Sequence, residues 1–138
     1  LEIREIPLDP SHTPLVSASI ITTHKWAQAH PEQARAVVKA TTDAMNAIAA
    51  DPQIAIDATK PWDDSLASED SLASANAVLA ATVPLWLGTS GHATGMQELT
   101  TWAQMVTFLD SLGELEGPVD PASVATNDYV SPAEEPQS

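Results

Sequence analysis

The chain has 138 residues, and its 19 acidic residues against 5 basic ones give a formal net charge of −14. Nucleic-acid phosphates and anionic lipid surfaces are both recognised through a basic face, so this composition argues against either kind of partner. The sequence contains no cysteine, which excludes disulfides, thiolate catalysis and cysteine-based zinc sites within it, and its 43% hydrophobic residues argue against wholesale disorder.

The first 23 residues predict two β-strands joined by a turn. Apolar residues recur through residues 1–8, LEIREIPL, and Asp9-Pro10 ends this first strand. Residues 15–23, LVSASIITT, follow Pro14 and predict a second, more buried strand. Two strands do not form a stable sheet by themselves, so the remaining strands are expected upstream. The opening residues have no signal-peptide pattern and no initiator methionine, and we therefore expect the sequence to be a piece of a longer protein.

Helix signals dominate the middle of the chain. Thr23 can cap a short helix over residues 24–30, and Pro31 begins the longest predicted helix, residues 31–50. The apolar stripe of that helix consists of Ala34, Val37, Val38, Thr41, Met45 and Ile48. A further helix begins at Asp51-Pro52 and stops near Lys60-Pro61, and the residues expected to face inward are Ile54, Ala55 and Ala58.

Two more helices are predicted in the second half. Ser68 or a neighbour caps a helix that runs to Val83, where Pro84 closes or kinks it. Residues 87–95, LGTSGHATG, predict a loop because three glycines interrupt them. Residues 99–112 predict an amphipathic helix whose apolar stripe consists of Trp102, Met105, Val106 and Leu109. Gly113 fits the C-terminal cap of this helix, and residues 131–138 predict a disordered tail. No apolar run reaches the roughly 18 residues of a membrane-spanning helix.

The order of several short motifs resembles one family. The first motif is a strand with its turn, LEIREIPLDPSHTP, followed by the return strand SASIITT. The others are the stretch AHPEQARAVVKATTDAMNAIAADPQIAID, the following helix that ends near a proline, Trp102 with FLDSLGELEGPVDP, and the ending ATNDYV. Together they make residues 1–130 similar to the C-terminal half of the periplasmic-type solute-binding proteins of ABC importers. The most similar branch is the one for thiamine pyrimidine precursors, aliphatic sulfonates, taurine and nitrate. In this reading, residues 117–130, GPVDPASVATNDYV, are the terminal signature, in which Asp120 caps a small helix and the Asn-Asp-Tyr segment packs the end back on the body.

This resemblance implies an α/β protein of two lobes with the ligand in the cleft between them. Residues 1–23 would supply a strand crossover and residues 24–130 a helical cover for one lobe. The implied function is capture of a small polar solute outside the cytoplasm and its delivery to the membrane permease of the importer, by closure of the lobes on the ligand. The N-terminal lobe, with much of the pocket, would be missing from this sequence. The implied location is periplasmic or extracellular, with a lipid anchor on the missing N-terminus as one option, and no cofactor is implied.

Five residues are candidates for contact with the solute. The resemblance places the turn residues Asp9, Ser11, His12 and Thr13 near the cleft, where rigid strand ends would present polar groups to the ligand. Trp86, between Pro84 and Gly88, is the one tryptophan considered near a cleft. The alternative is an ordinary surface turn whose polar side chains serve the backbone. Turns of this family often hold a glycine and an aromatic or acidic residue, and DPSHTP departs from that pattern, which leaves the usual ligand open.

Catalytic and metal-binding patterns are not found in the sequence. His24, His30 and His92 lack the spacing of a metal set, since no two lie four residues apart on one helix beside a carboxylate. No nucleophile elbow or phosphate-binding loop occurs. One branch of similar proteins is enzymatic and uses a cysteine-rich stretch, which has no counterpart here. Two rival functions stay open: a stand-alone acidic helical module for protein interaction, and an enzyme on the same scaffold.

Overall fold

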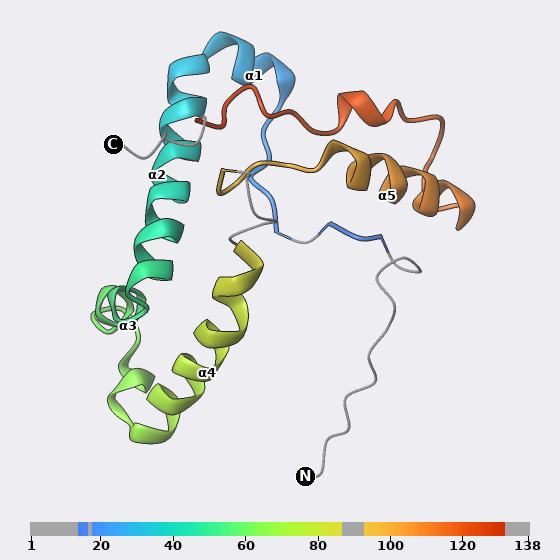
Figure 1. Ribbon diagram of the computed structural model, residues 1–138. Coiled ribbons are helices and arrows are strands. Elements are labelled where there is room, and N and C mark those ends of the chain that lie inside the picture. Colours follow the sequence, from blue (N-terminus) through green and yellow to red (C-terminus); the bar gives the residue numbers. More distant parts are fainter. Residues whose placement is uncertain (1–13, 17, 87–92, 132–138) are drawn as a thin grey trace, which may run out of the picture. The chain divides into compact units, whose positions relative to one another are not determined.

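The computed structural model describes residues 14–16, 18–86 and 93–131, and 64% of them are helical (Figure 1). The chain divides into two compact units. Unit 1 comprises Leu1–Ile21 and Gln97–Asp128, and unit 2 comprises Thr22–Met96 and Tyr129–Ser138. The described helices, in chain order, are α1 (His24–Ala29), α2 (Pro31–Ala50), α3 (Gln53–Thr59), the short 3₁₀-helix η2 (Asp64–Ala67), α4 (Glu69–Trp86), α5 (Leu99–Ser111) and the 3₁₀-helix η3 (Pro121–Ser123).

The predicted α/β fold is wrong for the part of the chain that the structure describes, which is all helical and contains no strand. The described residues of the predicted strand 15–23 have no regular secondary structure, and Ile21 is 87% exposed. The physical reason is that a strand needs a partner for its backbone groups, whereas the adjacent pair Ile20-Ile21 lacks the alternation that would bury one face. The predicted strand 1–8 lies outside the described residues.

Helices α1 and α2 begin and end where local signals place them. The Thr23 hydroxyl accepts a hydrogen bond from the Trp26 N–H at 3.1 Å, which satisfies one of the free amide groups at the start of α1. Pro31 occupies the first turn of α2, where its missing N–H costs nothing. The predicted helix over residues 31–50 is confirmed. Its predicted stripe is only partly covered, because Ala34 is buried whereas Val37 is exposed.

Unit 2 is held together by contacts of α2 with α1, α3 and α4, and by contacts of α4 with α3 and η2. Its buried residues come one from each element: Ala27, Ala34, Ile56, Leu66 and Val83. In α3 the inward position is Ile56 rather than the predicted Ile54, which is exposed. A two-turn helix has too few residues for its periodicity to define the buried face, so its rotation is fixed by what it packs against.

Helix α4 starts at the predicted cap and continues through the predicted breaker. The Ser68 hydroxyl accepts a hydrogen bond from the Ser71 N–H at 3.2 Å. Pro84 lies inside α4, two residues before Trp86 ends it. Proline removes a backbone donor from a helix interior, but here only two helical residues follow it, so α4 can end without a break at Pro84. One stripe of α4 is buried or half-buried and consists of Leu72, Ala75, Leu79, Thr82 and Val83.

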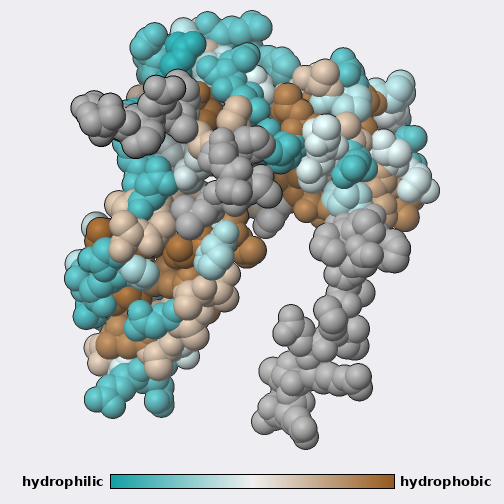
Figure 2. Space-filling view, in the orientation of Figure 1, coloured by the Kyte–Doolittle hydropathy of each residue, from teal (hydrophilic) through white to brown (hydrophobic). Residues whose placement is uncertain are grey.

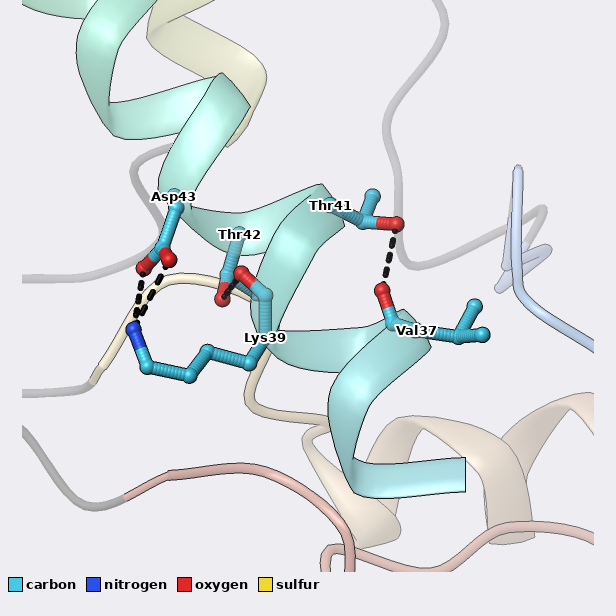
Figure 3. Close-up of polar contacts among 5 residues, drawn as sticks. All are labelled: Val37, Lys39, Thr41, Thr42 and Asp43. Atoms are coloured by element: carbon cyan, nitrogen blue, oxygen red, sulfur yellow. Dashed lines mark hydrogen bonds and ion pairs between the residues drawn. The ribbon is translucent and has the colours of Figure 1, made fainter. Parts of the chain in front are cut away.

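Helix α2 makes several polar contacts within itself, and these are exposed to solvent (Figure 3). The Lys39 ammonium group lies 2.7 Å from one carboxylate oxygen of Asp43, and both side chains are more than half exposed. The Thr41 and Thr42 hydroxyls donate to the Val37 and Lys39 carbonyls of the preceding turn. Exposed pairs of this kind contribute roughly 0.3–0.5 kcal/mol each, so they mark a solvated surface rather than a source of stability.

Unit 1 is built on α5, which contacts η3. Val106 is buried, and Trp102, Met105 and Leu109 are half-buried, so the predicted stripe is confirmed. Gly113 has φ +71°, as expected for a helix C-terminal cap. The Asp120 carboxylate accepts a hydrogen bond from the Ala122 N–H at 3.0 Å, so the predicted cap at the start of η3 is present.

Alanine substitutions at three glycines should distinguish the energetic cost of backbone strain from the cost of a steric clash. Gly95 has φ +85°, and a Cβ there would lie 2.6 Å from the Thr42 methyl carbon; Gly113 shares the positive φ but has open space around it. We expect Gly113→Ala to cost about 1–2 kcal/mol of unfolding free energy from strain alone, and Gly95→Ala about 1–3 kcal/mol more from overpacking. Gly117 has neither a positive φ nor a close neighbour, so Gly117→Ala is the control and should change the unfolding free energy by less than about 0.5 kcal/mol. Urea denaturation followed by circular dichroism tests this order, and equal losses at Gly95 and Gly113 would contradict it.

Acid should weaken the start of η2. Hydrogen bonds from the Ser65 side chain and then from its backbone N–H lower the pKa of the exposed Asp63 carboxyl below its ordinary value. The cap is therefore fully effective above the unfolded-state pKa, and its contribution is lost as the pH falls through the lower folded-state pKa. NMR titration of the Asp63 carboxyl carbon, in the folded chain and in urea, measures this difference. Ser65→Ala should raise the folded-state pKa, Ser74→Ala should leave it unchanged, and a folded-state pKa at or above the unfolded one would refute the account.

Candidate functional site

The residues proposed from sequence to contact a solute fall in different places. The turn residues Asp9, Ser11, His12 and Thr13 lie outside the described residues. Trp86 is the last residue of α4 and is half-buried in unit 2. Pro14, which directly follows the turn, is described, is half-buried and belongs to unit 1. The candidate site is therefore built from unit 1 alone.

A shallow hollow of about 420 Å³ lies beside Pro14, and we call it the Pro14 hollow. Five of its six lining residues come from α5. They recur at helical spacing and so share one helix face. The lining consists of Pro14, Ala103, Gln104, Thr107, Phe108 and Ser111. The Val16 N–H lies 3.4 Å from the Met105 sulfur, a weak hydrogen bond that holds this stretch of the chain against α5.

The lining of the Pro14 hollow is mostly apolar, with a few polar groups and no charged side chain. The Thr107 and Ser111 hydroxyls donate to the Ala103 and Phe108 carbonyls, at 3.0 and 2.7 Å, so their oxygens can still accept. The Gln104 amide makes no hydrogen bond to another described residue, and it can offer both a donor and an acceptor. The Phe108 ring and Pro14 supply apolar surface. Such a lining suits a small neutral molecule with a flat ring and polar edges.

A second hollow, of about 470 Å³, also lies on α5 and is lined by part of the terminal signature. Its lining consists of Val106, Thr107, Asp110, Leu115, Gly117, Pro118, Val119 and Pro121. The Asp110 carboxylate is the only ionised side chain in this lining. Sequence reasoning missed both hollows. The signal available for the first is the set Gln104, Thr107 and Ser111, which places polar groups at helical spacing beside the apolar stripe of α5.

The terminal signature holds the start of α5 through one amide side chain. The Asn127 carbonyl oxygen accepts from the Gln97 N–H at 2.8 Å, and the Asn127 amide nitrogen donates to the Gln97 carbonyl at 3.0 Å. The Gln97 side chain in turn accepts from the Trp102 indole N–H at 2.9 Å. In unit 2, the Arg35 guanidinium lies 5.8 Å from the centre of the Tyr129 ring. These contacts agree with the packing role expected of the Asn-Asp-Tyr segment.

The histidines form no metal site among the described residues. His24 and His30 flank α1, and the Trp26 and His30 rings lie 5.1 Å apart, centre to centre. The described part of the chain contains no group of three or more His, Cys, Asp or Glu side chains that could hold a metal ion. His92 lies outside it.

Comparison with protein-family models, with curated proteins and with solved structures finds no match for the chain. The family resemblance therefore rests on the motifs alone. Among the described residues, none of the helices combines the length and apolar character needed to cross a membrane.

Removal of the Asn127 amide should loosen the start of α5. Asn127→Ala removes the side chain that bonds to both backbone groups of Gln97. We expect a loss of about 1–3 kcal/mol of unfolding free energy. The loss should be nearer the lower value because water can reach this half-buried position. Asn127→Asp keeps the acceptor and should cost less. Exposed Asp128→Ala is the control. Urea denaturation measures this loss. Hydrogen exchange of the Gln97 amide should accelerate in Asn127→Ala, and an unchanged exchange rate would contradict the role of Asn127 in holding the start of α5.

Proposed function

We propose that the chain is part of the solute-binding component of an ABC importer, which captures a small polar solute outside the cytoplasm and delivers it to the membrane permease. The observation that carries the proposal is the agreement between motif order and helix order. The helices α2, α3, α4 and α5 succeed one another as the motif segments do, and the terminal signature follows with its cap at Asp120. The return strand, another motif of the resemblance, is not a strand in the described structure, so the support comes from the motifs that lie on helices and their caps.

The Pro14 hollow is the proposed contribution of this chain to the solute site. One of its lining residues, Pro14, directly follows the turn whose residues the resemblance assigns to the ligand, namely Asp9, Ser11, His12 and Thr13. Further ligand contacts are proposed to come from a preceding part of the receptor.

The chemistry of the lining favours one solute class over the others. A nitrate or sulfonate anion would meet no basic side chain in the hollow and would be repelled by a chain with a net charge of −14. A neutral pyrimidine can stack on Phe108 and exchange hydrogen bonds with Gln104 and the hydroxyl oxygens. A pyrimidine of the thiamine-precursor type is therefore the proposed solute.

A second candidate is an acidic helical module for protein interaction. The all-helical described structure and the large surplus of carboxylates favour it. Such a module would bind a protein partner and would show no saturable affinity for any small solute.

A solute screen on the polypeptide as the cell makes it tests the proposal. Pyrimidine, sulfonate, nitrate and flavin-type compounds are compared by thermal shift, since a ligand of the folded state raises the melting temperature, and hits are titrated by calorimetry. We expect a pyrimidine to bind and Gln104→Ala to weaken it roughly threefold to tenfold, the equivalent of about one hydrogen bond. Gln33→Ala, an exposed glutamine on α2, is the matched control. Absence of any binding solute, or equal binding by Gln104→Ala, would reject the proposed site.

A further inference from the structure

The second hollow on α5 differs in chemistry from the Pro14 hollow, and we call it the Asp110 hollow. Much of its lining is apolar: Val106 is buried, Leu115 is half-buried, and Val119 lies in the segment that follows α5. Figure 2 shows apolar and hydrophilic side chains next to each other over α5 and this following segment. The volume of about 470 Å³ lies in the range of small-molecule sites. A ligand of this hollow therefore needs an apolar body of modest size.

The polar side chains of the Asp110 hollow offer hydrogen-bond acceptors and no free donor. An ionised carboxylate such as that of Asp110 only accepts hydrogen bonds. Thr107 lies three residues earlier on the same helix face, and its hydroxyl hydrogen is already donated to the Ala103 carbonyl at 3.0 Å. The Thr107 oxygen is thus left to accept. A ligand held by both side chains must consequently bring the hydrogen-bond donors itself.

No basic residue of the surrounding segment neutralises the Asp110 carboxylate. This carboxylate has no hydrogen-bond or ion-pair partner among the described residues. The segment Gln97–Asp128, which supplies the whole lining, contains no Lys, Arg or His. Its acidic residues are Glu98, Asp110, Glu114, Glu116, Asp120 and Asp128. The field of these carboxylates attracts cations and repels anions.

We propose that the Asp110 hollow binds a small primary alkylamine, with its ammonium group at Asp110 and its chain against the apolar part of the lining. An ammonium group has three N–H donors and no acceptor, which matches the Asp110 carboxylate and the Thr107 oxygen. Apolar walls lower the local dielectric constant, so the ion pair is stronger there than on an open surface. This site goes beyond the proposed function, because it takes a ligand of another class in another hollow.

Other cations fit this hollow less well. A quaternary ammonium ion has no N–H donor, and the lining contains no aromatic ring to hold it by cation–π attraction. A metal ion needs several ligands, and the described residues bring together no group of three acidic, histidine or cysteine side chains. A lysine of another protein carries the same ammonium group, so the experiment must separate it from a free amine.

Calorimetric titration of the polypeptide as the cell makes it tests the proposal, with n-hexylammonium as the probe. Methylammonium keeps the charge without the chain, 1-hexanol keeps the chain without the charge, and tetraethylammonium is a cation without N–H donors. We expect n-hexylammonium to bind at least about fivefold more tightly than each of them. Absence of n-hexylammonium binding, or equal binding by any of the three, would overturn the proposal. The methylamide of acetylated lysine tests the other source, and tighter binding of this compound than of n-hexylammonium would also overturn it.

Matched variants locate the bound amine. Asp110→Asn keeps the size of the side chain but removes its charge, and we expect it to weaken n-hexylammonium binding roughly tenfold. Asp128→Asn removes one exposed charge elsewhere in the same segment and should change the affinity less than about twofold, because salt screens a distant charge. Circular dichroism verifies that each variant is folded.

Two results with these variants would overturn the proposal. Equal weakening by Asp110→Asn and Asp128→Asn would reduce the effect to net charge. Weakening by Gln104→Ala in place of Asp110→Asn would put the amine in the Pro14 hollow. Amine binding is measured without a pyrimidine, so this proposal and the solute screen can fail separately.

Discussion

Shallow burial is the constraint on which the described structure depends. Six of the seven described helices contribute one buried residue each, η3 contributes none, and two of the six residues, Ala27 and Ala34, are alanines. An alanine removes little apolar area from water, so helices packed through alanines lie close together but gain little from each contact. The larger apolar side chains, such as Val37 and Val78, consequently stay at the surface of the described chain. Unit 2 depends on α2, which contacts three other helices, for bringing these small contributions together.

The helix ends could be predicted because their causes lie within a few residues. Thr23 and Asp120 act on amide groups two or three residues ahead, Pro31 is tolerated at the first turn, and Gly113 adopts the positive φ that ends α5. Such signals do not depend on what the helix later packs against. The sequence therefore sufficed to predict α2 over residues 31–50 and to place the end of α5 at Gly113.

The features that sequence reasoning missed depend on distant partners. A strand over residues 15–23 needed a neighbouring strand, and none exists among the described residues. The choice of Ile56 over Ile54 as the buried residue of α3 reflects contacts with α2 and α4. Asn127 bonds to Gln97, 30 residues earlier, and no local pattern specifies that pairing. The Pro14 hollow likewise joins Pro14 to a helix nearly ninety residues later, as the Val16–Met105 contact does.

The Pro14 hollow needs a second wall before it can enclose a solute. Binding sites for small molecules bury about 70–90% of the ligand surface, and a shallow hollow on one helix cannot do so alone. A solute seated against Gln104 and Phe108 would need a second wall to exclude water and strengthen its hydrogen bonds. The proposed solute-binding function therefore requires further residues around the Pro14 hollow, whereas an acidic interaction module would not require them.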